Sequence, residues 1–190
     1  MERITEKDDS QIHRQWKETY KKAKQNLDQN NFQYAASILE GILESEPGYT
    51  DARTLLLHCR MAESQPKPEY YRATIGMCMA FLLYYVIGPL LSRKGRYAAL
   101  VRKAERFLAY DGKNPLTLHI LGQTLKAAGA VSGARTTLEM ASRFHPEDYD
   151  IQKTLADVYG ATGDYKRQRQ TLENLRKIRP EDRQLQEELA

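Results

Sequence analysis

The chain has 190 residues, of which 41% are hydrophobic and 28% charged, a composition typical of a folded protein and not of a disordered one. The formal net charge is +4, and the basic excess lies in the second half, where residues 93–190 carry 18 Lys and Arg against 13 Asp and Glu. An excess of 18 − 13 = 5 without a clustered basic stripe argues against a nucleic-acid partner.

The N-terminal part of the chain carries the apolar spacing of amphipathic helices. Apolar side chains recur three or four residues apart at Trp16, Tyr20, Ala23 and Leu27, at Ala35, Leu39 and Leu43, and at Ala52, Leu55, Leu56 and Cys59. A turn at residues 30–32 and Pro47 separate these three stretches. The third helix should end at residues 65–68, where two prolines close together stop a helix.

Residues 73–92 contain no charged side chain, and Arg93, Lys94 and Arg96 follow them closely. A run of about 20 apolar residues is long enough to cross a bilayer as a helix. Three interpretations stay open: a repeat helix buried on all sides or packed under its neighbours, a membrane span, and a segment that docks on a partner or a membrane face. If the run spans a membrane, the basic residues after it favour a cytoplasmic C-terminal part.

The second half of the chain repeats itself at an offset of 34 residues. This offset relates Leu121 to Leu155, Gly129 to Gly163, Leu138 to Leu172 and Pro146 to Pro180. An offset shared by turn residues and core residues indicates an internal repeat. Within each unit, apolar spacing predicts two helices, the first ended by glycine and the second by proline. A looser match precedes these units, at Tyr84, Ile87, Gly88, Leu91, Gly95, Tyr97, Leu100, Ala104 and Phe107.

These motifs resemble the tetratricopeptide repeat (TPR), a helix–turn–helix unit of about 34 residues. The unit from Pro115 has Leu121-Gly122, Gly129, Ala134, Leu138 and Pro146, and the unit from Tyr149 has Leu155-Ala156, Tyr159, Gly163-Asp164-Tyr165, Leu172 and Pro180. The second unit departs from the pattern at Gln168, where a small residue is usual, which should loosen its packing. The resemblance implies an all-α fold, a right-handed helix–turn–helix solenoid of roughly four helical pairs. A capping helix with Leu185 and Leu189 should follow from Glu181.

The resemblance also implies a domain plan and a binding surface. We expect N-terminal TPR-like helices over 1–65, a proline break and an apolar helix over 66–92, and C-terminal repeats with the capping helix over 93–190. In this family, ligands lie in a concave groove lined by the first helix of each pair. The groove residues would be Lys17, Tyr20 and Lys24 of the first unit, Leu116, His119, Gln123 and Lys126 of the third, and Asp150, Lys153 and Asp157 of the last. The expected function is a non-catalytic scaffold for a partner protein or peptide. The alternative is a membrane-anchored TPR assembly protein with residues 73–92 as the anchor.

Residues that could carry chemistry are sparse. His58 and Cys59 are adjacent and would diverge by about 100° on a helix, and neither His119 nor His145 has an evident acid or nucleophile beside it. The sequence has no CxxC, HExxH or glycine-rich phosphate loop. We therefore expect no enzymatic activity, no metal and no cofactor.

The location and the assembly state are expectations of the same kind. The chain has two cysteines, and its charged N-terminus has no apolar core of signal-peptide length. Both features favour a cytoplasmic location, with membrane association through residues 73–92 as the alternative. A homo-oligomer formed through an uncapped repeat edge is left open.

Overall fold

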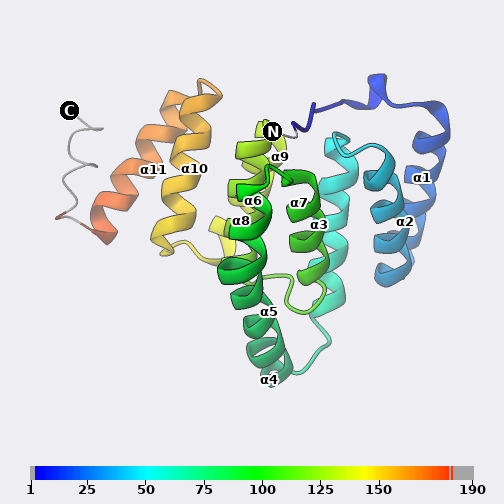
Figure 1. Ribbon diagram of the computed structural model, residues 1–190, viewed down its shortest axis with the longest axis horizontal. Helices are drawn as coiled ribbons and strands as arrows, with labels where there is room; N and C mark the ends of the chain where they lie inside the picture. The colour runs from blue at the N-terminus through cyan, green and yellow to red at the C-terminus, as the bar shows by residue number, and fades with distance from the viewer. Residues whose placement is uncertain (1–2, 180, 182–190) are drawn as a thin grey trace.

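The computed structural model describes residues 3–179 and 181, and Figure 1 shows their helices laid side by side in an elongated array. This part of the chain has no strand, only an isolated bridge between Lys7 and Tyr49. Outside the apolar segment the helices are α1 (Arg14–Asp28), α2 (Phe32–Ser45), α3 (Thr50–Ser64), α7 (Tyr97–Phe107), α8 (Pro115–Ala128), α9 (Val131–Phe144), α10 (Tyr149–Ala161) and α11 (Tyr165–Ile178), with a short 3-10 turn, η1 (Asp9–Gln11), before α1. The capping helix predicted with Leu185 and Leu189, and the closing Pro180, lie outside the described residues.

Helices end where the sequence predicts they should. Gly129 follows α8 with φ +89° and Gly163 precedes α11 with φ +74°, a left-handed conformation that glycine adopts without strain. Ser64 is the last residue of α3, immediately before the proline-rich break. The starts of α8 and α10 are capped by Asn114 and Asp148, whose side chains accept hydrogen bonds from backbone N–H groups of the first turn.

The apolar segment forms one continuous helix over residues 69–93, hereafter the apolar helix. It consists of α4 (Glu69–Tyr71), η2 (Arg72–Gly76), α5 (Met77–Leu82), η3 (Leu83–Ile87) and α6 (Gly88–Arg93). The two η segments are π-helical, and the N–H of Gly88 bonds to the carbonyl of Leu83, five residues earlier. Pro89 follows this wider turn. A wider turn relieves the clash between a proline ring and the preceding carbonyls, so the helix continues through Pro89.

Four helix pairs can be traced within residues 14–178: α1 with α2, the apolar helix with α7, α8 with α9, and α10 with α11. The prediction of an all-α repeat of about four helical pairs is confirmed. The helix α3 stands outside this pairing, because it packs against α2 on one side and against α7 and α9 on the other. Figure 1 accordingly shows α3 beside α7, although the apolar helix follows α3 in the chain.

The largest buried cluster joins the N-terminal and C-terminal parts of the chain. Leu57 and Met61 of α3 lie in the same core as Leu118 and Leu138 of the third pair, and Ile4 joins them from the N-terminal segment. The N–H of Ile4 also donates to the carbonyl of Ala128 at 2.8 Å. Residues before 65 therefore pack directly on residues after 93. The domain boundaries at 65 and 92 stay a prediction.

Small residues set the spacing inside two pairs. A Cβ added to Gly122 would lie 2.5 Å from Cγ of Leu138, so α8 and α9 approach each other through the missing side chain. In the last pair a Cβ on Gly160 would meet Nε2 of Gln168 at 2.7 Å. Gly160 of α10 thus leaves room for the larger side chain of Gln168 in α11. The unit departs from the TPR pattern at Gln168, and its two helices still pack against each other.

The apolar helix buries only one of its faces. Gly76, Ala80, Leu83, Gly88 and Leu91 are buried, toward α7 and α8, while most of the large side chains between them are exposed. The interpretation of residues 73–92 as a helix buried on all sides is therefore wrong. The helix packs through a single narrow face with three Gly or Ala residues, and no helix among the described residues covers its other faces. Among the described residues it is the one helix long and apolar enough to cross a membrane by length and composition, with a mean hydropathy of 1.9 over a window that is 28% buried.

Candidate binding groove

Two of the predicted groove residues of α8, His119 and Lys126, contact α10. Nε2 of His119 lies 2.9 Å from Oγ1 of Thr154, and Nζ of Lys126 donates to Oδ2 of Asp157 at 2.8 Å. Burial lowers the pKa of His119, and the nearby Asp150 opposes this shift. Because His119 is inside the protein, it joins neighbouring repeats and does not present a polar group to a ligand.

The remaining predicted residues of the last unit lie on α10. Asp150 is exposed in its first turn, and Lys153 is half-buried with Nζ 5.8 Å from the ring centroid of Tyr149. They share this helix with Asp157, the partner of Lys126. The structure thus brings His119 and Lys126 of the third unit against α10 of the last, with His119 buried and Asp150 and Asp157 exposed.

The predicted residues of the first unit lie elsewhere. Lys17, Tyr20 and Lys24 sit on α1, at the opposite end of the array from α10 (Figure 1). Lys17 faces Asp9 at 3.6 Å, and the Tyr20 ring packs 5.4 Å from that of Tyr49, while Lys24 is exposed. Burial raises the pKa of Tyr20, helped by the charges of Asp51 and Asp9. These three residues do not share a groove with the others.

A groove of about 450 Å³ lies between the apolar helix and α8, with the start of α7 as its floor. Its walls are mostly apolar and come from Leu83, Tyr84, Pro89, Tyr97, Leu100, Ile120 and Ala127, together with Gly88, Ser92, Gln123 and Thr124. Gln123 is the residue that both the sequence and the structure place in this groove, and it is exposed. The hydroxyl of Thr124 already donates to the Ile120 carbonyl at 2.7 Å. An amide such as that of Gln123 has both N–H donors and a carbonyl acceptor, so it can both donate to and accept from a bound backbone.

Sequence reasoning missed the wall that the apolar helix supplies. Tyr84, Gly88 and Leu91 match the repeat pattern, and this match was the available signal that the apolar helix is the first helix of a pair. The pattern indicates which positions face the paired helix, but not that Leu83 and Pro89 line a groove together with residues of α8.

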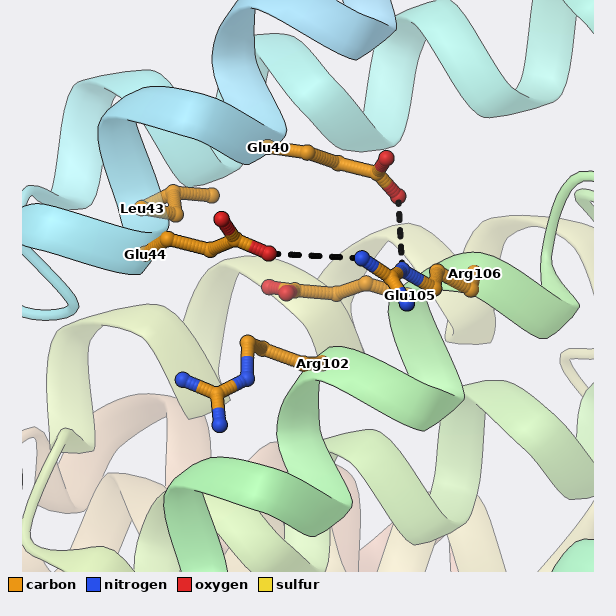
Figure 2. Close-up of a pocket in the computed structure, with 6 residues that line it drawn as sticks. All are labelled: Glu40, Leu43, Glu44, Arg102, Glu105 and Arg106. Carbon is orange, nitrogen blue, oxygen red and sulfur yellow. Dashed lines mark hydrogen bonds and ion pairs between the residues drawn. The ribbon is translucent and has the colours of Figure 1, made fainter.

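A second hollow lies between α2, α3 and α7, and its charges are engaged with each other. Arg60 contacts Glu40 and Glu63, each at 2.6 Å, and Arg106 contacts Glu44 at 3.3 Å. Figure 2 shows Glu40 and Glu44 of α2 reaching toward Arg106 of α7, with the guanidinium of Arg102 turned away from them. The space between α2 and α7 that Glu40, Glu44, Arg102 and Arg106 line is only about 10 Å³, enough for about one water molecule. The adjoining hollow, which Arg60 and Glu63 of α3 help to line, has a volume of about 520 Å³. The ion pairs along its walls join α2 to α3 and α7.

The cysteines and acidic groups give no reactive centre within residues 3–179. Cys59 is buried, and burial raises the pKa of its thiol to about 11, which keeps it protonated. Cys78 is exposed on the apolar helix. In the same described part of the chain, no three His, Cys, Asp or Glu side chains lie close enough together to hold a metal ion.

The helix pairs define the described residues as an all-α helical repeat. No family model matches the sequence, and no curated protein matches it. A solved structure described as "Functional Characterization of Pseudomonas Aeruginosa pilF" is similar, with 19% sequence identity, coverage of 90% of this chain and 79% of that one, and a TM-score of 0.46. A score this low does not establish a common arrangement of the repeats, so the fold class rests on the helix pairs of this chain.

Proposed function

We propose that this protein is a non-catalytic scaffold that binds a segment of a partner protein in the groove between the apolar helix and α8. The observation that supports this function is the groove itself. Its volume of about 450 Å³ is in the range of ligand sites, and its apolar walls surround a few polar groups. Tyr84 and Pro89 would contact apolar side chains of the bound segment, and Gln123 would bond to its backbone.

The groove has a fixed wall before any partner binds. The His119–Thr154 and Lys126–Asp157 contacts hold α8 against α10. Pre-formed walls reduce the entropy lost on binding, which favours affinity. In this proposal His119, Lys126 and Asp157 stabilise the wall of the groove, and Gln123 contacts the partner.

Photo-crosslinking in cells tests this function. A photoreactive residue at Gln123 should give a discrete adduct with a partner, and the same residue at Gln170, exposed on α11, should not. Ala127→Arg places a long side chain in the groove and should abolish the Gln123 adduct, whereas Gln170→Arg should leave it unchanged. An adduct that persists in the Ala127→Arg protein, or the same adducts from both positions, would refute the groove as the binding site.

A second candidate function is attachment to a membrane through residues 73–92. It is favoured by the exposed apolar faces of the apolar helix and by the absence of charge over 20 positions. Membrane attachment is compatible with the scaffold function, because the groove uses only the edge of the apolar helix that faces α8.

A further inference from the structure

The exposed side of the apolar helix is an apolar surface without a protein neighbour. Its large side chains are between 39% and 67% exposed, at Met77, Phe81, Leu82, Tyr85, Val86 and Leu90. The buried side is narrow because its small residues let α7 and α8 approach closely. A contiguous apolar surface of this kind is rare on soluble monomers and marks an interaction site.

The chemistry of this surface favours lipid over protein as its partner. Residues 73–92 carry no charge, and at about 1.5 Å per residue they extend over about 30 Å. Protein interfaces surround an apolar centre with a polar, often charged rim, and between residues 73 and 92 this helix contributes no charged side chain to such a rim. At its end, Arg93, Lys94 and Arg96 are exposed, which suits the phosphates of anionic lipids.

The fold does not allow this helix to cross the bilayer once. A single crossing would put residues before 69 and residues after 93 on opposite sides of the membrane. These two parts are packed together: α3 contacts α7 and α9, and Ile4 bonds to Ala128. Arg53 and Glu105 form an ion pair of 2.7 Å inside the same interface. Crossing would therefore require the shared core to be taken apart.

We propose that the protein binds the surface of an anionic membrane with the apolar helix lying in the plane of the bilayer, its exposed face in the lipid and both flanking parts on the same side. This inference rests on membrane attachment, the second candidate function, and specifies its geometry. The covered face of Ala80 and Leu83 stays on α7 and α8, so the repeat fold is unchanged on binding. The apolar area and the basic residues act together, as in other in-plane helices.

Vesicle flotation of the full chain tests the attachment. The protein should float with vesicles of phosphatidylcholine and phosphatidylglycerol, and less with phosphatidylcholine alone. Phe81→Asp with Val86→Asp should lower the floated fraction by about tenfold, because each carboxylate would have to leave water together with this face. Tyr34→Asp, at an exposed aromatic position on α2, is the matched control and should float like the wild type. Both positions on the apolar helix are exposed, so circular dichroism should show all variants folded.

Labelling in sealed membranes from expressing cells tests the geometry separately. A membrane-impermeant maleimide should reach Gln15→Cys and Gln170→Cys from the same side, in a Cys78→Ser background. Flotation with labelling from opposite sides would overturn the in-plane geometry and leave attachment standing. Absence of flotation would overturn both. Self-association in solution that the Phe81→Asp/Val86→Asp variant abolishes, with no flotation, would assign the surface to a second copy of this chain.

Discussion

Nε of Arg53 in α3 donates to Oε1 of Glu105 in α7 at 2.7 Å, with the two side chains only 4% and 3% exposed. Arg53 also donates from Nη2 to the carbonyl of Pro47 at 2.9 Å. Burial raises the pKa of Glu105, and the charge of Arg53 opposes that shift. This pair joins two helices that are far apart in the chain, and it lies where the N-terminal helices meet the C-terminal repeats.

Removing one member of this pair should destabilise the whole protein. Arg53→Met or Glu105→Leu leaves a buried charged partner without its counterpart, and each should lower the free energy of unfolding by about 3–5 kcal/mol. Arg53→Met combined with Glu105→Leu removes both groups and should cost less than the sum of the single losses. Urea denaturation of the four proteins measures the coupling. Strictly additive losses would mean that the two side chains do not interact.

Gly122 should not tolerate a side chain. Gly122→Ala would push a methyl group against Leu138, which is buried, and should destabilise the protein by about 1–3 kcal/mol through overpacking between α8 and α9. Gly41→Ala is the matched control, because no heavy atom lies within 4 Å of a Cβ at that helical position. It should stabilise the protein by up to about 1 kcal/mol through helix propensity. Thermal unfolding distinguishes the two, and equal effects would rule out a packing role for Gly122.

His119 should make stability depend on pH. Burial lowers its pKa in the folded state, so below about pH 6.5 the unfolded chain takes up a proton more readily than the folded one. The stabilisation is therefore complete above that pH and is lost as the pH falls through the folded-state value. His119→Gln removes this proton uptake. The stability difference between the wild type and the variant should narrow on acidification from pH 8 to pH 5, as measured by urea denaturation, with His58→Gln at an exposed position for comparison. A pH-independent difference would contradict the assignment.

Sequence alone determined the helices and most of their ends. Gly129, Gly163 and the prolines at 66 and 68 act through local backbone geometry, which does not depend on the rest of the fold. The repeat offset likewise identified the pairs α8/α9 and α10/α11, whereas the expectation that Gln123 faces a groove came from the resemblance to the TPR. These features depend on neighbours within one unit, so they can be read from spacing.

Contacts between distant segments decided what the sequence could not. The start of α9 has Ala130 at its N-cap, which offers no side-chain acceptor. Glu6 supplies it, accepting from the N–H groups of Ser132 at 3.1 Å and Gly133 at 2.8 Å. No local pattern predicts a cap from 126 residues away.

Contacts between distant segments also separate the first unit from the groove and determine which face of the apolar helix is exposed. Leu57, Met61 and Arg53 place α3 on α7 and α9, so Lys17, Tyr20 and Lys24 end at the far side of the array. In residues 73–92 every position is uncharged, so the hydrophobic pattern does not mark which face is covered. Only the packing of small residues against α7 and α8 decides that one face is inside and the other is exposed.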